Sequence, residues 1–169
     1  MWRQNGSINR LLEPTHLLAR FSRCPGRWCP LKRKRHDLAL LIPDQLMGAE
    51  AAKWLYEAAP FGVLAHNNAP DPLFVYGNKA AQRLFEYEWD ELTTLPSRLS
   101  AEAPDREERQ HLLEQVESRG FITGYRGIRI SKSGRRFRVE NATVWQLLDT
   151  DGKCHGQAAM LPQTLDIEL

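Results

Sequence analysis

The sequence predicts an α+β domain: a five-stranded antiparallel sheet with helices on one face, in the element order β-β-α-α-α-β-β-β. A short run of β-formers, Leu73–Tyr76, passes through Gly77-Asn78 directly into a run of helix formers. The last third of the chain alternates apolar and polar residues in three segments, separated by turns that end in Gly134 and Gly152. Two strands, a helical crossover and a three-stranded meander can close into one such sheet.

Length and composition favour one cytoplasmic domain. The 169 residues have room for a domain of about 100–150 residues plus appendages. The 23 basic and 21 acidic residues nearly balance, so the overall charge makes no case for nucleic-acid binding. Three cysteines without a secretory signal indicate reduced thiols. No apolar run approaches the ~20 residues that span a bilayer, so we expect no membrane contact.

Residues 1–42 lack sustained periodicity and are expected to form a disordered or poorly ordered leader. Two alternatives stay open, a basic patch at Lys32–His36 and a zinc knuckle. The ligands of such a knuckle would be Cys24, Cys29 and His36, with His16 as a fourth. The wide cysteine spacing and the absence of a paired second half argue against it, so we expect no metal. The domain is then expected at 43–162, with 163–169 as a polar tail.

A leading helix and a hairpin are expected to open the domain. Asp44 is a plausible N-cap, and an apolar stripe follows it at helical spacing. The first two strands are predicted at Phe61–Ala65 and Leu73–Tyr76. The intervening His66–Pro72 is rich in Asn, Asp and Pro, which favours a turn. The stripe of the leading helix consists of Met47, Ala51, Trp54, Leu55 and Ala58.

The crossover is predicted to contain three helical pieces. Asn78 lies where an N-cap belongs, because its side-chain oxygen can accept an otherwise unpaired N–H of the first turn. Ala80, Ala81, Leu84 and Phe85 follow it at helical spacing. A short piece is expected at Glu88–Thr94. A third helix should begin with the capping pair Asp105 and Glu108 and end at Gly120.

Three antiparallel strands are expected to complete the sheet, at Phe121–Ile130, Arg135–Leu148 and Cys154–Leu161. The turns Ser131–Gly134 and Asp149–Gly152 join them, and each glycine supplies the positive φ that a tight connection needs.

These motifs resemble the PAS fold, and more closely the MEKHLA family of PAS-like domains. The PAS-like motifs are Val75–Asn78, Ala80–Phe85 and Asp149–Gly152. The stretches similar to MEKHLA domains cover about residues 44–162: Ala59–Phe61, Asp71–Phe74, Tyr76–Asn78, Leu95–Ala101, Arg106–Arg109, Ile130–Phe137 and Ala142–Trp145. The resemblance implies a sensory or protein-interaction module for signalling.

In PAS-like folds a ligand lies between the inner face of the sheet and the crossover helices. The resemblance therefore gives these pocket candidates: Phe74, Tyr76, Leu84, Phe85, Trp89, Phe121, Ile128, Asn141 and Trp145. Such a pocket would be mostly apolar, with Tyr76 and Asn141 as the polar groups, so the expected ligand is a small apolar metabolite. The alternative is that these aromatic side chains simply fill the core.

We expect no cofactor and no catalysis. The cysteine of light-sensing relatives is missing, since none lies between Cys29 and Cys154, and His111 is expected to face solvent rather than to bind haem. His66, Asp71 and Ser97 have the residue types of a catalytic triad, but nothing in the sequence brings them together. A small enzyme using the same pocket, or an adaptor without ligand, remains the alternative. The expected partner is a protein or a second copy of the chain, reached for example through the basic hairpin tip at 130–136, and nucleic acid is not expected.

Overall fold

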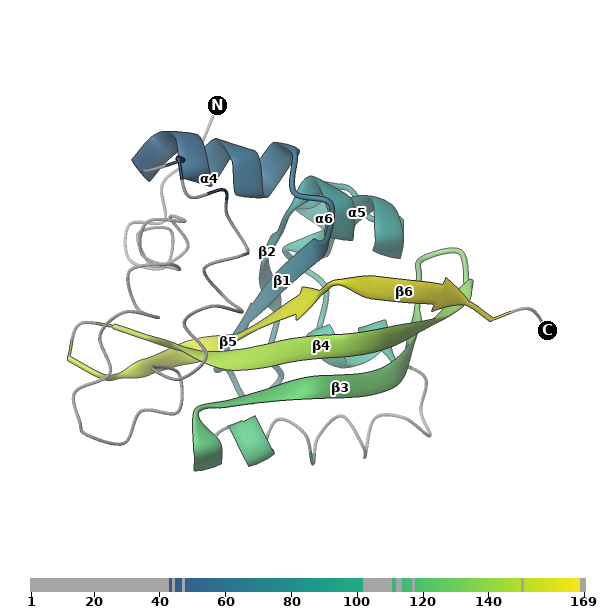
Figure 1. Cartoon of the computed structure of the whole chain (residues 1–169). Coiled ribbons are helices and arrows are strands. Elements are labelled where there is room, and N and C mark those ends of the chain that lie inside the picture. Colours follow the sequence, from purple (N-terminus) through teal and green to yellow (C-terminus); the bar gives the residue numbers. More distant parts are fainter. Residues whose placement is uncertain are drawn as a thin grey trace.

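Six strands form one antiparallel sheet in the computed structural model, which describes residues 43, 45–46, 48–101, 111, 114–116, 118–149 and 151–167. The strand order is β2-β1-β5-β4-β3, and β6 also pairs with β4 (Figure 1). The predicted α+β class and antiparallel sheet are confirmed. The strands are β1 (Gly62–Asn67), β2 (Phe74–Gly77), β3 (Phe121–Ile130), β4 (Arg136–Leu148), β5 (Cys154–Leu161) and β6 (Gln163–Asp166).

The helices with described bounds are α4 (Gly48–Glu57), α5 (Lys79–Phe85), α6 (Trp89–Leu92) and the 3₁₀ helix η2 (Ser97–Ser100). The described residues between 111 and 119 are helical as well. The predicted leader at 1–42, the Asp44 cap and the capping pair at Asp105 and Glu108 lie outside the described residues. None of the described helices is long and apolar enough to cross a membrane.

The segment expected as a polar tail contains the sixth strand, and this corrects the prediction. Gln163–Asp166 pairs with the first half of β4, from Glu140 back to Phe137. The second half of β4 pairs with β5. Pro162 separates β5 from β6. Because proline has no N–H to donate to a neighbouring strand, a proline in the sequence indicates that a strand ends there. Here the chain continues past Pro162 along the same edge of β4.

The two faces of the sheet have separate cores. We call inner face the side that carries Leu64 and Leu161, which pack with Phe85 of α5 and Leu92 of α6. The outer face carries side chains that cluster with α4, since successive strand residues point to opposite faces. The predicted placement of the crossover helices on one face is therefore observed, whereas the leading helix covers the other. The outer-face cluster consists of Val63, Ala65, Trp145, Leu147 and Ala158, with Ala51, Leu55, Ala59 and Tyr76.

A bulge at the centre of the β3–β4 pair changes which residues point inward. Asn141 has a φ of 55°, a left-handed conformation that Asn tolerates, and the register of β3 shifts on both sides of Tyr125. Phe137 and Val139 lie in the inner core before the bulge, and Ala142 lies there after it. Trp145 consequently points to the outer face.

Asn78 connects α4, β1 and α5. The predicted N-cap is confirmed, because Asn78 Oδ1 accepts the N–H of Ala81 at 3.0 Å. The same oxygen accepts the N–H of Val63 at 2.9 Å, and Nδ2 donates to the carbonyls of Leu55 at 3.1 Å and Phe61 at 2.9 Å. The side chain is fully buried. One amide group therefore joins the outer-face helix to the first inner-face helix.

The tip of the β3–β4 hairpin is attached to the end of α5 through Glu86. Its carboxylate accepts the N–H of Ser133 at 3.1 Å, the hydroxyl of Ser131 at 2.8 Å and Nε of Arg135 at 3.1 Å. Hydrogen bonds from Ser133, Ser131 and Arg135 lower the pKa of Glu86 to about 2. Arg135 also donates to the carbonyl of Leu84 at 2.6 Å. Part of the basic tip that was expected to meet a partner is thus engaged within the domain.

Candidate functional site: a pocket on the inner face

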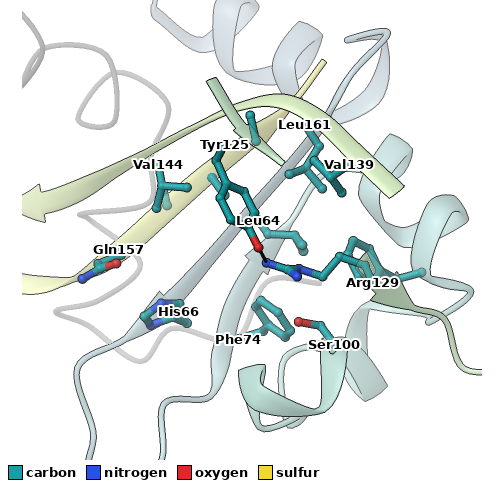
Figure 2. A pocket seen from close by; sticks show the side chains of 14 residues that line it. Leu64, His66, Phe74, Ser100, Tyr125, Arg129, Val139, Val144, Gln157 and Leu161 are labelled. Carbon is teal, nitrogen blue, oxygen red and sulfur yellow. Dashed lines mark hydrogen bonds between the residues drawn. The ribbon is translucent and has the colours of Figure 1, made fainter. Parts of the chain in front are cut away.

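A pocket lies between the inner face of the sheet, Phe85 of α5 and Ser100 of η2 (Figure 2). Its volume is about 60 Å³. At about 10–15 Å³ for each water, this is room for roughly four to six waters or a comparably small ligand. The pocket is lined by Leu64, His66, Phe74, Phe85, Ser100, Tyr125, Arg129, Val139, Ala142, Val144, Gln157, Ala158, Ala159 and Leu161.

Apolar side chains make most of the wall. Phe74 is 4% exposed and Phe85 is 1% exposed, and both belong to the inner core. The ring of Phe85 meets that of Phe137 edge-on, with centroids 5.1 Å apart. An edge-to-face pair fixes the position of both rings. This wall therefore offers a fixed apolar surface to a small hydrocarbon group.

The polar groups of the pocket lie toward its two ends. Figure 2 shows Arg129, Tyr125 and Ser100 near one another, and His66 and Gln157 away from them. Arg129 Nη2 donates to the Tyr125 hydroxyl at 2.8 Å, and Nη1 donates to the carbonyl of Ile128 at 2.7 Å. Arg129 is only 8% exposed. A buried guanidinium, which stays charged at any physiological pH, is the strongest polar feature of the site.

The remaining polar groups have defined roles. Ser100 donates its hydroxyl proton to the carbonyl of Ser97 at 2.7 Å, so its oxygen is left as an acceptor. His66 Nδ1 lies 2.7 Å from the carbonyl of Asn67 and must carry a proton to donate to it. Gln157 is directly opposite His66 in the β1–β5 pair.

Two of the predicted pocket residues, Phe74 and Phe85, line this pocket. The other seven do not. Tyr76, Phe121 and Trp145 pack in or against the outer-face cluster, and Trp89 packs against that cluster as well. Leu84 packs against the inner core without lining the pocket, and Ile128 and Asn141 are also outside the lining.

The bulge explains the misplaced residues of the late strands. A shift of one residue moves a whole strand segment to the other face. Continuous alternation through β4 had placed Trp145 inside, but Asn141 takes up one extra residue and is itself exposed. On β3 the prediction had chosen Ile128, whereas Arg129 beside it is the buried residue. A one-residue error in register therefore replaced the buried arginine by its apolar neighbour.

One signal in the sequence could have located the arginine. Tyr125, Gly127 and Arg129 alternate along β3, which puts all three on one face. A strand glycine between two large residues often marks a place where another group passes close to the backbone. Here that group is the ring of Tyr125, whose hydroxyl oxygen would lie 2.0 Å from a Cβ built on Gly127.

Two of the three residues with the types of a catalytic triad, Asp71 and His66, have contacts outside such a triad. Asp71 binds Arg98, with Nε 3.0 Å and Nη2 3.2 Å from its two oxygens. The Nδ1 atom of His66 faces a backbone carbonyl. His111 is exposed, as predicted, and lies 3.8 Å from Glu114. Within the described residues, no three His, Cys, Asp or Glu side chains are grouped so that they could hold a metal ion.

Solved structures with the same arrangement are PAS and light-oxygen-voltage domains. The crystal structure of the PAS domain of a protein from Colwellia psychrerythraea is similar with a TM-score of 0.54 at 17% identity, over 63% of this chain and 86% of that chain. A light-oxygen-voltage domain studied with a flavin analogue gives 0.53 at 16% identity, over 65% and 79% of the two chains. An RNA-binding light-oxygen-voltage receptor gives 0.55 at 16% identity, over 85% of this chain and 36% of that one. At these identities the likeness concerns the fold alone.

The family comparison agrees with the motifs in the sequence. No curated protein matches this chain. The model of the MEKHLA domain matches residues 34–165, a range that begins before the expected start near residue 44 and includes most of β6. The chain therefore belongs to the MEKHLA domain family, and its fold is that of a PAS-like sensory domain.

Proposed function

We propose that this protein is a sensory module that binds a small molecule in the inner-face pocket and passes the signal to a protein partner. The observation that carries the proposal is the pocket itself, which lies between the sheet and the crossover segments in a PAS-like fold. A mostly apolar cavity with a few polar groups is the usual form of a small-molecule site. The volume of about 60 Å³ favours a compact ligand over a large ring system.

Binding without turnover is the better account of the polar groups. A nucleophile needs a base within hydrogen-bond reach. The Ser100 hydroxyl donates instead to a backbone carbonyl. Tyr125 and Arg129 bind each other, an arrangement that suits the positioning of a charge more than a proton transfer. We therefore propose a receptor and not an enzyme.

The output is proposed to be contact with another protein or with a second copy of the chain, in the cytoplasm. The free edge of β6 supports this proposal. Within the described sheet β6 pairs with β4 alone, and Leu165 on this strand is 52% exposed. An unpaired strand edge with an exposed apolar side chain is a surface on which another chain can dock.

Blocking the pocket tests the proposal. Val144→Phe places an aromatic ring into the cavity, whereas Ala52→Phe adds the same ring to α4, on the opposite side of the sheet. The full-length protein and both variants are screened against a library of small metabolites by thermal shift, and each binder is verified by native mass spectrometry. We expect binders for the wild type and for Ala52→Phe, and none for Val144→Phe.

Two results would count against a receptor. One is a wild-type protein that binds no member of the library. The other is a binder that Val144→Phe retains with unchanged affinity, which would place the site elsewhere. Conversion of a bound compound into product by the wild type would favour the enzyme instead.

A further inference from the structure

The pocket contains a buried positive charge that has no negative partner among the described residues. Arg129 is 8% exposed, and no carboxylate of the described residues lies within ion-pair distance of it. None of the described residues that line the pocket is acidic. Burial of an unpaired charge is costly, because hydrogen bonds to neutral groups replace only part of the hydration. A buried, unpaired arginine is therefore expected where a bound anion neutralises its charge.

The local structure holds this cation at the pocket. Gly127 has no side chain, so the ring of Tyr125 can lie over it and reach Arg129 two residues further on. The guanidinium carbon is 5.2 Å from the centre of that ring, a cation–π distance. A Cβ at Gly127 would come within 2.0 Å of the Tyr125 hydroxyl oxygen and would displace it. Three alternate residues of β3 thus fix one charge.

The guanidinium keeps donors for a ligand. It carries five N–H groups in a planar fork, and its two hydrogen bonds use one on Nη1 and one on Nη2. Three N–H groups remain. Two parallel N–H···O bonds to a carboxylate are the strongest and most specific pairing that a guanidinium forms.

The rest of the wall limits what the anion can carry. Leu64, Phe74 and Leu161 are apolar and line the same cavity. These surfaces suit a short hydrocarbon group. They offer no hydrogen-bond partner to those oxygens of a phosphate or sulfate that Arg129 does not bind. The volume of about 60 Å³ corresponds to roughly four to six non-hydrogen atoms.

We infer that the ligand is a small monocarboxylate, with its carboxylate on Arg129 and its carbon chain against the apolar wall. This inference differs from the apolar metabolite predicted from the sequence, and it presupposes that the pocket binds a small molecule, as proposed above. Propionate and pyruvate represent the class in size and charge.

Calorimetric titration of the full-length protein tests the charge requirement. The probes are propionate and pyruvate, with propionamide as the neutral counterpart of propionate and nitrate as an anion without a carbon chain. We expect the carboxylates to bind, and propionamide and nitrate to bind at least tenfold more weakly. Arg129→Met should weaken the carboxylates about 10–100-fold, because charge-assisted hydrogen bonds are lost.

Arg126→Met is the matched control. Arg126 lies on the same strand, is 76% exposed and pairs with Glu140 at 2.9 Å. Its removal should leave carboxylate binding unchanged. Tyr125→Phe keeps the ring and removes only the hydroxyl that holds Arg129, and it should weaken binding about 3–10-fold. This variant serves as the test if Arg129→Met does not fold.

The failures of the two proposals are distinguishable. If propionamide binds as tightly as propionate, or if Arg129→Met retains full carboxylate affinity, the monocarboxylate is refuted and the receptor stands. Nitrate binding equal to that of propionate would also refute the carboxylate class. If no probe and no library member binds the wild type, both proposals fail.

Discussion

The two faces of the sheet are built from the same strands, but one face is filled by its helix and the other contains a cavity. On the outer face, α4 closes over Val63, Ala65 and Trp145, and the aromatic rings of Tyr56, Tyr76 and Trp89 meet at centroid distances of 5.7–6.3 Å. On the inner face, α5 and η2 leave a cavity of about 60 Å³ that holds a buried arginine. The difference teaches that a continuous helix closes one face, whereas a crossover of short helical pieces leaves space on the other.

The largest effect is expected where the two faces are joined. Asn78→Ala removes four hydrogen bonds to three segments, and it leaves buried N–H and C=O groups unpaired. At about 1–3 kcal/mol for each unpaired group, with partial relaxation, we expect a loss of about 4–6 kcal/mol in the free energy of unfolding. Urea denaturation measures it.

A control separates the cap from the rest of this loss. Asn78→Ser keeps an oxygen for the N–H of Ala81 but has no donor for the carbonyls of Leu55 and Phe61. Its cost should fall between zero and that of alanine. If Asn78→Ala costs only the ~1 kcal/mol of an isolated N-cap, the two faces are not joined through this residue.

Phe85→Ala should be the most damaging change within the pocket wall. The ring is 1% exposed and stacks edge-on with Phe137, so its removal enlarges an existing cavity. We expect a loss of about 3–4 kcal/mol in the absence of ligand. Guanidinium unfolding monitored by circular dichroism gives the value, and an unchanged midpoint would mean that the inner face repacks freely.

A matched pair of valines compares the two faces directly. Val63 is 1% exposed in the outer core, and Val144 is 5% exposed and lines the pocket. Val63→Ala should cost about 2 kcal/mol, because packed atoms surround the lost methyl groups on all sides. Val144→Ala should cost about 1 kcal/mol, since one side of that valine already faces empty space. Equal losses would contradict the difference between the faces.

Tyr76→Phe tests the packing of the outer face through an expected gain in stability. The Tyr76 hydroxyl is buried and makes no hydrogen bond within the described residues, and burial, with Tyr56 nearby, raises the pKa of Tyr76 above its usual value. Removal of an unpaired buried hydroxyl should stabilise the protein by about 0.5–1 kcal/mol. The thermal midpoint would rise by a few degrees, whereas a fall would reveal a partner for this hydroxyl.

Acid should loosen the inner layer through Glu86. Its pKa of about 2 in the folded protein lies below the ordinary value of 4.5, so the carboxylate contributes stability that is complete above pH 4.5 and lost as the pH falls toward 2. Glu86→Gln should reduce the slope of stability against pH in that window. Parallel curves for the two proteins would show that Glu86 does not link α5 to the hairpin.

Local patterns predicted most of the fold and little of the pocket. Asn78 after a short strand indicated a cap, and glycines 134 and 152, each with positive φ in the structure, indicated the hairpin turns. These features depend on neighbours in the chain. The pocket depends on which face each residue occupies, and this was lost at Asn141, whose bulge no alternating pattern indicates.

Two further misses have the same cause. The pairing of Gln163–Asp166 with β4 is a contact between distant segments, and Pro162 concealed it. Arg129 was not among the predicted pocket residues; a charged residue in a strand is usually exposed, and its hydrogen bond to Tyr125 across Gly127 accounts for its burial. Both facts belong to the tertiary structure.

The bulge at Asn141 acts on β4 much as a frameshift acts on a gene. Residues before it keep their assignment to the two faces, and the residues after it up to Leu147 are exchanged relative to an unbroken strand. Deletion of this single residue would turn Trp145 toward the pocket and Val144 toward α4, without any change in composition. Related chains that gained or lost one residue here would carry different pockets on the same scaffold, so diversity of ligands in such a fold can arise from insertions as readily as from substitutions.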